Sequence, residues 1–207
     1  MKHLIRIALV LGIAASAAPL HAQLFYIGLR GGAGIPTGSF SDTTGTAQDQ
    51  FLAGAKTGFG YGLDAGINFG PLGLYAGFDH IKFECEEQVC SADNKYKLQG
   101  VSAGVRLTLP LVPMVRPWVK GGVTFNELEA DFTTGSNPQL TTERSPGYEL
   151  GAGFDFPIAS FFSLTPQVRY IGQKLDYKIP GVISGTTSNK AANYYTFDLG
   201  LRFRSPI

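Results

Sequence analysis

The sequence predicts an all-β fold: a single eight-stranded antiparallel up-and-down transmembrane β-barrel. Three observations lead to this prediction: a glycine-rich, charge-poor composition, apolar residues at every second position, and connections that alternate between long and short. Charged residues make up 16% of the 207-residue chain, whereas soluble domains carry roughly 25%. Glycine contributes 27 residues, and the formal net charge of +1 gives no electrostatic footprint for nucleic acid.

The first 22 residues have the features of a secretory signal peptide. Two basic residues, Lys2 and Arg6, precede an uncharged, mostly apolar run, and the small residue Ala22 offers a cleavage point. The apolar run is too short to span a membrane as a helix. We therefore predict an export leader at residues 1–22 and one barrel domain at residues 23–207. A buried N-terminal helix is the alternative interpretation of the leader.

Eight segments alternate apolar residues with small or polar ones, which is the period of a β-strand that has two different faces. In chain order these segments are 25–34, 58–69, 72–79, 100–109, 118–126, 147–156, 162–170 and 195–203. Their apolar faces begin in the same order with Phe25, Phe59, Leu72, Val101, Val119, Tyr148, Phe162 and Tyr195. No segment of comparable length has a helical period.

The connections between the segments alternate in length. The short ones are 70–71, 110–115 and 157–160, and the long, polar ones are 35–57, 85–95, 128–146 and 176–193. Outer-membrane barrels combine short periplasmic turns, long external loops and an even number of strands. The alternation therefore predicts that both ends of the barrel domain lie in the periplasm.

The apolar face is expected to meet lipid, because the opposite face is too sparsely polar to coat a soluble protein. That face consists mostly of glycine, serine and threonine, and its glycines leave room for the long side chains of Tyr26, Tyr75 and Trp118. It also carries five acidic and five basic residues, which are expected to pair because an unpaired charge in a narrow lumen is costly. The predicted structural network is Arg30, Asp64, Asp79, Arg106, Lys120, Glu149, Asp155, Arg169, Asp198 and Arg202. A soluble lipocalin-like barrel, with the two faces inverted, is the alternative.

Neighbouring antiparallel strands predict which of these charges meet. The expected contacts are Arg30 with Asp64, Lys120 with Glu149, Arg169 with Asp155, and Arg202 and Asp198 opposite Arg30 across the closure. Aromatic residues are expected to form two interfacial girdles. The inner girdle is Phe25, Phe69, Phe156, Phe162 and Phe203, and the outer one is Phe59, Phe83, Phe125, Tyr148, Tyr170 and Tyr195.

Segments such as Gly58-Phe59-Gly60-Tyr61-Gly62 have the strand character of a known family. From Gln23 to Phe203 the chain resembles the small eight-stranded outer-membrane barrels of the OmpA, OmpX and opacity-protein type. The resemblance implies the outer membrane of a Gram-negative bacterium, contact with its lipid and lipopolysaccharide, and insertion by the outer-membrane assembly machinery. The chain departs from the family by continuing past Phe203, and the peptidoglycan-binding domain of some OmpA-type proteins is not expected here.

The residues that could carry chemistry are few. Cys85 and Cys90 are predicted to form a small disulfide in an external loop, since an exported chain meets an oxidising compartment. Two free thiols or a metal site are the alternatives, although a metal would need further ligands. His80 is the one histidine after the leader, and its neighbours do not resemble the His-x-Ser arrangement of lipid A deacylases. We predict no catalytic, metal or cofactor site.

The functional prediction is a structural or surface-interaction protein of the outer membrane. Eight strands leave an interior just wide enough to be filled by side chains, so the inward charges are expected to plug the lumen. A small pore or ion channel is the alternative. The long external loops offer surfaces for an extracellular partner, an expectation that rests on family analogy.

Overall fold

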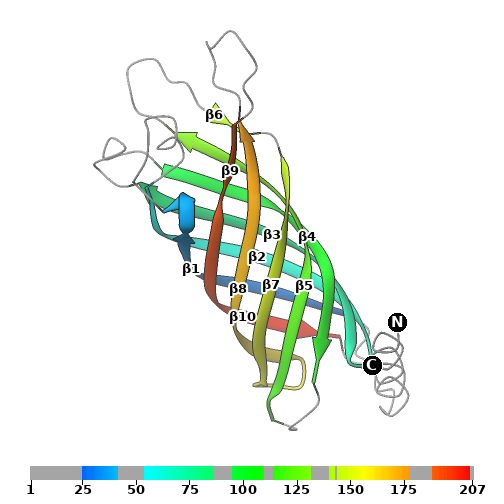
Figure 1. The fold of residues 1–207 in the computed structure, drawn as a ribbon. Coiled ribbons are helices and arrows are strands. Elements are labelled where there is room, and N and C mark those ends of the chain that lie inside the picture. The colour runs from blue at the N-terminus through cyan, green and yellow to red at the C-terminus, as the bar shows by residue number, and fades with distance from the viewer. Residues whose placement is uncertain are drawn as a thin grey trace, which may run out of the picture.

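The computed structural model describes residues 25–41, 54–85, 95–109, 114–131, 140–142, 144–177 and 188–205. The leader predicted at residues 1–22 lies outside these described residues. Within them, no helix is long and apolar enough to cross a membrane. Figure 1 shows strands wound around one closed wall.

Eight long strands form the wall, and two short ones extend it. The long strands are β1 (Phe25–Thr37), β2 (Ala55–Phe69), β3 (Leu72–Cys85), β4 (Lys95–Thr108), β5 (Arg116–Asp131), β7 (Ser145–Pro157), β8 (Phe162–Tyr177) and β10 (Asn193–Arg204). The short β6 (Leu140–Thr141) pairs with β5, the short β9 (Ser188–Ala191) pairs with β8, and a 3-10 helix, η1 (Gly38–Phe40), follows β1.

Each long strand pairs antiparallel with its neighbours in the chain, and the last strand closes on the first. The β10–β1 ladder runs from the pair Tyr26 and Arg204 to the pair Thr37 and Asn193. On its other edge β10 pairs with β8. The predicted closed, eight-stranded, up-and-down barrel is thus confirmed.

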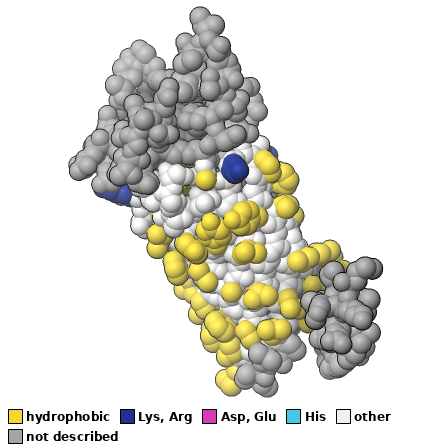
Figure 2. Space-filling model, in the orientation of Figure 1, with side chains coloured by type: hydrophobic (Ala, Val, Ile, Leu, Met, Phe, Trp, Pro, Cys, Tyr) yellow, Lys and Arg dark blue, Asp and Glu magenta, His cyan; other side chains and the backbone are white. Residues whose placement is uncertain are grey.

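The outer wall is apolar, as predicted for a face that meets lipid. Leu29 is 63% exposed and Phe59 is 69% exposed, whereas the inward-facing Glu149 is 1% exposed. On the face shown in Figure 2, hydrophobic side chains cover the middle and lower wall, and Lys and Arg are visible only near the upper end. A soluble barrel would carry these faces inverted, so the alternative of a lipocalin-like barrel does not fit.

The strands continue further at the outer end than the alternation predicted. The third segment was expected to end at residue 79, but β3 ends at Cys85. Beyond that point the faces exchange character: Ile81 and Phe83 are buried in the lumen, and Lys82 is exposed on the outside. A wall that has left the membrane faces a polar surrounding, so its apolar side chains turn inward.

An apolar cluster lies in the lumen at this outer end, and we call it the outer apolar cluster. Phe40, carried by η1, packs edge-to-face on Phe83 with ring centroids 5.3 Å apart, and Phe83 packs on Tyr194 at 5.4 Å. Placing Phe83 in the lipid-facing girdle was therefore wrong, because its side chain is fully buried in the lumen. The whole cluster is Phe40, Ala55, Ile81, Phe83, Tyr96, Leu98, Leu128, Ile171, Ala192 and Tyr194.

Glycines on the lumen face make room for large inward side chains. A Cβ atom at Gly122 would lie 2.4 Å from the carbonyl oxygen of Ala103 and 2.5 Å from the hydroxyl of Tyr75. The next glycine along β5, Gly121, points to the lipid side, where a Cβ atom would lie 3.4 Å from the nearest atom of Leu150. A larger side chain would therefore clash at Gly122 but has room at Gly121.

We expect Gly122→Val to lower the free energy of unfolding by about 1–3 kcal/mol, the usual cost of overpacking. Gly121→Val should leave that free energy unchanged or raise it, because valine favours strands and has room there. Urea titration of both variants refolded in lipid vesicles measures the difference. Equal effects of the two substitutions would contradict the assignment of lumen and lipid faces on β5.

Candidate functional site

The lumen below the outer apolar cluster contains the charged residues that the sequence analysis selected. All ten of those side chains point inward, and each of the ten residues as a whole is no more than 9% exposed. Arg204, at the end of β10, joins them with 8% exposure. We call these eleven residues the lumen charge network.

Arg169 on β8 is the centre of the upper part of the network. Its guanidinium binds both carboxylate oxygens of Asp79, with Nη2–Oδ1 at 2.9 Å and Nη1–Oδ2 at 3.0 Å. Its Nε lies 2.9 Å from Oδ2 of Asp198, and its Nη1 lies 3.5 Å from Oε2 of Glu149. One arginine therefore connects carboxylates from β3, β7 and β10, and β3 is not a neighbour of β8 in the sheet.

Arg30 on β1 extends this cluster toward β2. Its Nη1 lies 2.7 Å from Oδ1 of Asp64, and its Nη2 lies 2.9 Å from Oδ2 of Asp79. Asp79 is thus shared between Arg30 and Arg169. Two cations beside one carboxylate lower the cost of burying its negative charge.

The carboxylate of Glu149, on β7, has three side-chain partners in the lumen. Nζ of Lys120 lies 3.2 Å from its Oε2, and the hydroxyl of Tyr75 donates to its Oε1 at 2.6 Å. Nζ of Lys120 also lies 4.5 Å from the centroid of the Tyr75 ring, within the range of a cation–π contact. With Arg169 as the third partner, Glu149 is held from several sides of the lumen.

Asp155 on β7 is the centre of the lower part of the network. Nη2 of Arg106 and Nη1 of Arg202 each lie 2.6 Å from one of its oxygens, and Arg204 also binds it. The indole Nε1 of Trp118 donates to the same carboxylate at 3.1 Å. Three guanidinium groups around one carboxylate leave an excess of positive charge in this part of the lumen.

Aromatic rings offset part of that excess positive charge through cation–π contacts. The guanidinium carbon of Arg106 lies 4.3 Å from the centroid of the Trp118 ring, and that of Arg202 lies 4.6 Å from the centroid of the Tyr26 ring. A desolvated cation–π contact of this kind contributes about 2 kcal/mol. The inward aromatic side chains therefore stabilise the arginine charges as well as occupying space in the lumen.

A contact between Arg202 and Asp64 joins the two parts, with Nη2–Oδ2 at 3.6 Å. The ion pairs then run without a break from Asp198 to Arg204. Beside Arg30 and Arg202 the lumen holds a cavity of about 10 Å³, about the room that one water molecule needs.

Two of the expected pairs are present and two are not. Arg30 meets Asp64 and Lys120 meets Glu149, as neighbouring strands required. The expected contact of Arg169 with Asp155 was wrong, because Arg169 is in register with Gly151, four residues or roughly 13 Å along the strand from Asp155.

The expected arrangement at the closure was also wrong. Arg202 and Asp198 were expected together, opposite Arg30. Instead Arg202 turns toward Asp64 and Asp155, and Asp198 turns toward Arg169.

Sequence reasoning missed Arg204 and the partners of the lumen aromatics. Arg204 continues the inward phase of Arg202, so following the alternation one step past Phe203 would have found it. Tyr75 and Trp118 were placed in the lumen for their size alone, although each donates a hydrogen bond to a carboxylate. A polar tip on an inward aromatic is the signal that pointed to such a bond.

The remaining predicted features lie elsewhere or outside the described residues. Cys90 is not among the described residues, so the Cys85–Cys90 disulfide stays a prediction. His80 is half-buried on the outer wall, with its ring centroid 5.1 Å from that of Tyr61, while Asp79 points into the lumen. Across the described ranges, no group of three or more His, Cys, Asp or Glu side chains could hold a metal ion.

Comparisons with known proteins give a consistent result. Residues 7–204 match the family described as "Outer membrane protein beta-barrel domain". No curated protein matches the sequence significantly.

Several solved structures share the fold at low sequence identity. The Neisserial surface protein A (NspA) has a TM-score of 0.61 and 15% identity, covering 87% of this chain and 97% of NspA. OprG of Pseudomonas aeruginosa has a TM-score of 0.52 and 12% identity, covering 89% of this chain and 98% of OprG. Ail of Yersinia pestis has a TM-score of 0.50 and 16% identity, covering 88% of this chain and 97% of Ail.

We expect Glu149→Ala to lower the free energy of unfolding by about 3–5 kcal/mol, because it leaves Lys120 and part of Arg169 buried without their partner. Urea or thermal unfolding of the refolded protein measures this loss. The matched control is Glu127→Ala, which removes the partner of Arg144, a side chain that is 60% exposed. That surface pair should contribute only about 0–1 kcal/mol. Equal losses in the two variants would mean that Glu149 is not buried in the lumen.

Proposed function

The chain belongs to the outer membrane protein beta-barrel domain family, and from that premise we propose that it is a non-enzymatic, non-conducting outer-membrane barrel. In this proposal the wall serves as an anchor in the membrane, and the lumen is closed to ions by side chains. The role of the protein is then structural or in surface interaction, through the loops at the outer end.

The observation that supports the proposal is that inward side chains contact one another at successive levels of the lumen. The outer apolar cluster comes first, and beneath it Nδ2 of Asn126 donates to Oε1 of Gln173 at 2.6 Å. The Arg169 and Asp155 parts of the lumen charge network follow toward the periplasmic end. An ion crossing the barrel would have to displace an apolar layer and then separate buried ion pairs, each step being unfavourable.

The proposal also covers the export of the protein, its insertion into the membrane and its lipid environment. We propose that residues 1–22 direct export, that the outer-membrane assembly machinery inserts the barrel, and that lipid and lipopolysaccharide surround it. The exposed apolar wall supports this last point, because it needs an apolar surrounding.

The surface-interaction role rests on the length and polar composition of the connections predicted to be external, which are residues 35–57, 85–95, 128–146 and 176–193. Ail, the attachment invasion locus protein of Yersinia pestis, has the same fold. At 16% identity this likeness supports the architecture and identifies no partner for the present chain.

We expect purified protein in planar lipid bilayers to give no stable single-channel steps. Glu149→Ala should reduce thermal stability without creating conductance, because the outer apolar cluster still closes the lumen. Stable, reproducible steps from the unmodified protein would refute the proposal in favour of a pore. Unchanged stability with increased conductance in Glu149→Ala would mean that the charges gate an ion path.

A further inference from the structure

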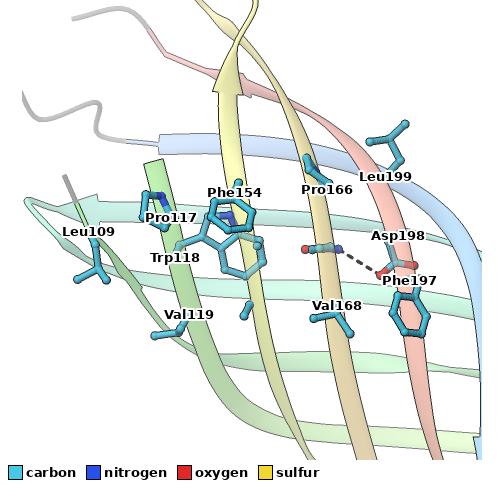
Figure 3. A pocket seen from close by; sticks show the side chains of 13 residues that line it. Leu109, Pro117, Trp118, Val119, Phe154, Pro166, Val168, Phe197, Asp198 and Leu199 are labelled. Atoms are coloured by element: carbon cyan, nitrogen blue, oxygen red, sulfur yellow. Dashed lines mark hydrogen bonds between the residues drawn. The ribbon is translucent and has the colours of Figure 1, made fainter. Parts of the chain in front are cut away.

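An apolar groove of about 670 Å³ lies on the lipid-facing side of the wall (Figure 3). It crosses β5, β7, β8 and β10, and its volume falls in the roughly 300–1,000 Å³ range of small-molecule sites. The lipid-facing residues that form its centre are Val119, Ala152, Phe154, Pro166, Val168 and Phe197.

The groove lies where the β7–β8 ladder lacks two residue pairs. The β7–β8 register pairs Gly153 with Gln167 and then Phe156 with Leu164, and Phe154 has no ladder partner on β8. Pro166, which would stand opposite Phe154, has no N–H to donate and cannot complete the ladder there.

The floor of the groove reaches side chains that belong to the lumen. Gly153 separates the groove from Trp118, and a Cβ atom at Gly153 would lie 2.6 Å from Cζ2 of that indole. Figure 3 shows Trp118 behind Phe154, and the dashed bond runs to Asp198 from the amide of Gln167. Trp118 and Asp198 therefore line the groove although each is at most 9% exposed.

The depth of the groove indicates which leaflet faces it. Phe154 lies three residues before the end of β7 at Pro157, and Pro117 lies one residue after the start of β5. Both strand ends lead into short connections, which are on the periplasmic side in barrels of this kind. The groove consequently faces the inner leaflet, which in a bacterial outer membrane consists of phospholipid.

We propose that this groove binds one acyl chain of an inner-leaflet phospholipid. The groove opens sideways into the hydrocarbon region, and its outward-facing lining is apolar. An acyl chain fits both conditions, and by lying on Phe154 and Pro166 it covers the point at which the β7–β8 ladder is interrupted. The site concerns the outside of the barrel and is independent of whether the lumen conducts ions.

The protein contains its own reporter for this site. Trp118 is the single tryptophan of the chain and lines the groove. Bromine atoms on an acyl chain quench tryptophan emission only at short range. The experiment is to refold the protein in phosphatidylcholine vesicles in which a defined fraction of the lipid carries one brominated acyl chain, and to record Trp118 fluorescence.

We expect the brominated phospholipid to quench Trp118, and Ala152→Phe to remove most of that quenching by filling the groove. The matched control is Ala103→Phe, a lipid-facing alanine on β4 outside the groove, which should leave the quenching unchanged. Insertion of each variant is checked by its compact migration on unheated SDS gels, and Ala152→Leu replaces the phenylalanine variant if that one does not insert.

Three results would overturn the proposal. The first is quenching that persists undiminished in an inserted Ala152 variant. The second is quenching by a brominated free fatty acid but not by the brominated phospholipid. The third is quenching that disappears as the protein-to-lipid ratio is raised, because a second copy of the chain would then cover the groove.

Discussion

The contacts of Arg169 are the interaction on which the rest of the lumen depends. This guanidinium spans the barrel from β8 to Asp79 on β3, and on the way it meets carboxylates of its neighbours β7 and β10. A buried ion pair gains little over an apolar core, but removal of either partner is costly because the other charge stays buried. Removal of any one member of the lumen charge network should therefore be costly. The glycines and aromatic residues of the lumen face provide the space and some of the partners that these charges require.

The wall changes its chemistry along its length because its surroundings change. In the membrane the outside is apolar and the charges lie within, whereas at the outer end Ile81 and Phe83 turn inward and Lys82 turns outward. The side chains alternate along the whole strand, but the apolar face points outward in the membrane and inward beyond it. The same strand, β3, contributes Asp79 to the lumen charge network and Phe83 to the outer apolar cluster.

Much of the fold could be predicted because a period of two fixes the face of every residue in a strand. The eight strands, their order and the inward position of the ten charges followed from that period. The strand ends at the outer side did not, because the prediction followed lipid-facing apolar residues and these stop where the faces exchange. Phe83 was misplaced for this reason.

The partners in the lumen were only partly predictable. Arg30 and Asp64 lie on adjacent strands at nearly the same level, so sequence order was enough. The contact of Arg169 with Asp79 crosses the lumen, and it depends on strand tilt and stagger, which one sequence does not reveal. The groove over Pro166 likewise depends on how four strands, β5, β7, β8 and β10, align with one another.

The central claim is that charges on opposite walls of the lumen stabilise each other. A double-mutant cycle with Arg169→Met and Asp79→Asn, measured as free energies of unfolding in lipid vesicles, tests it most directly. The contact predicts a coupling free energy of about 1–3 kcal/mol between the two positions. Effects that add to within about 0.5 kcal/mol would contradict the claim, since independent sites behave in that way.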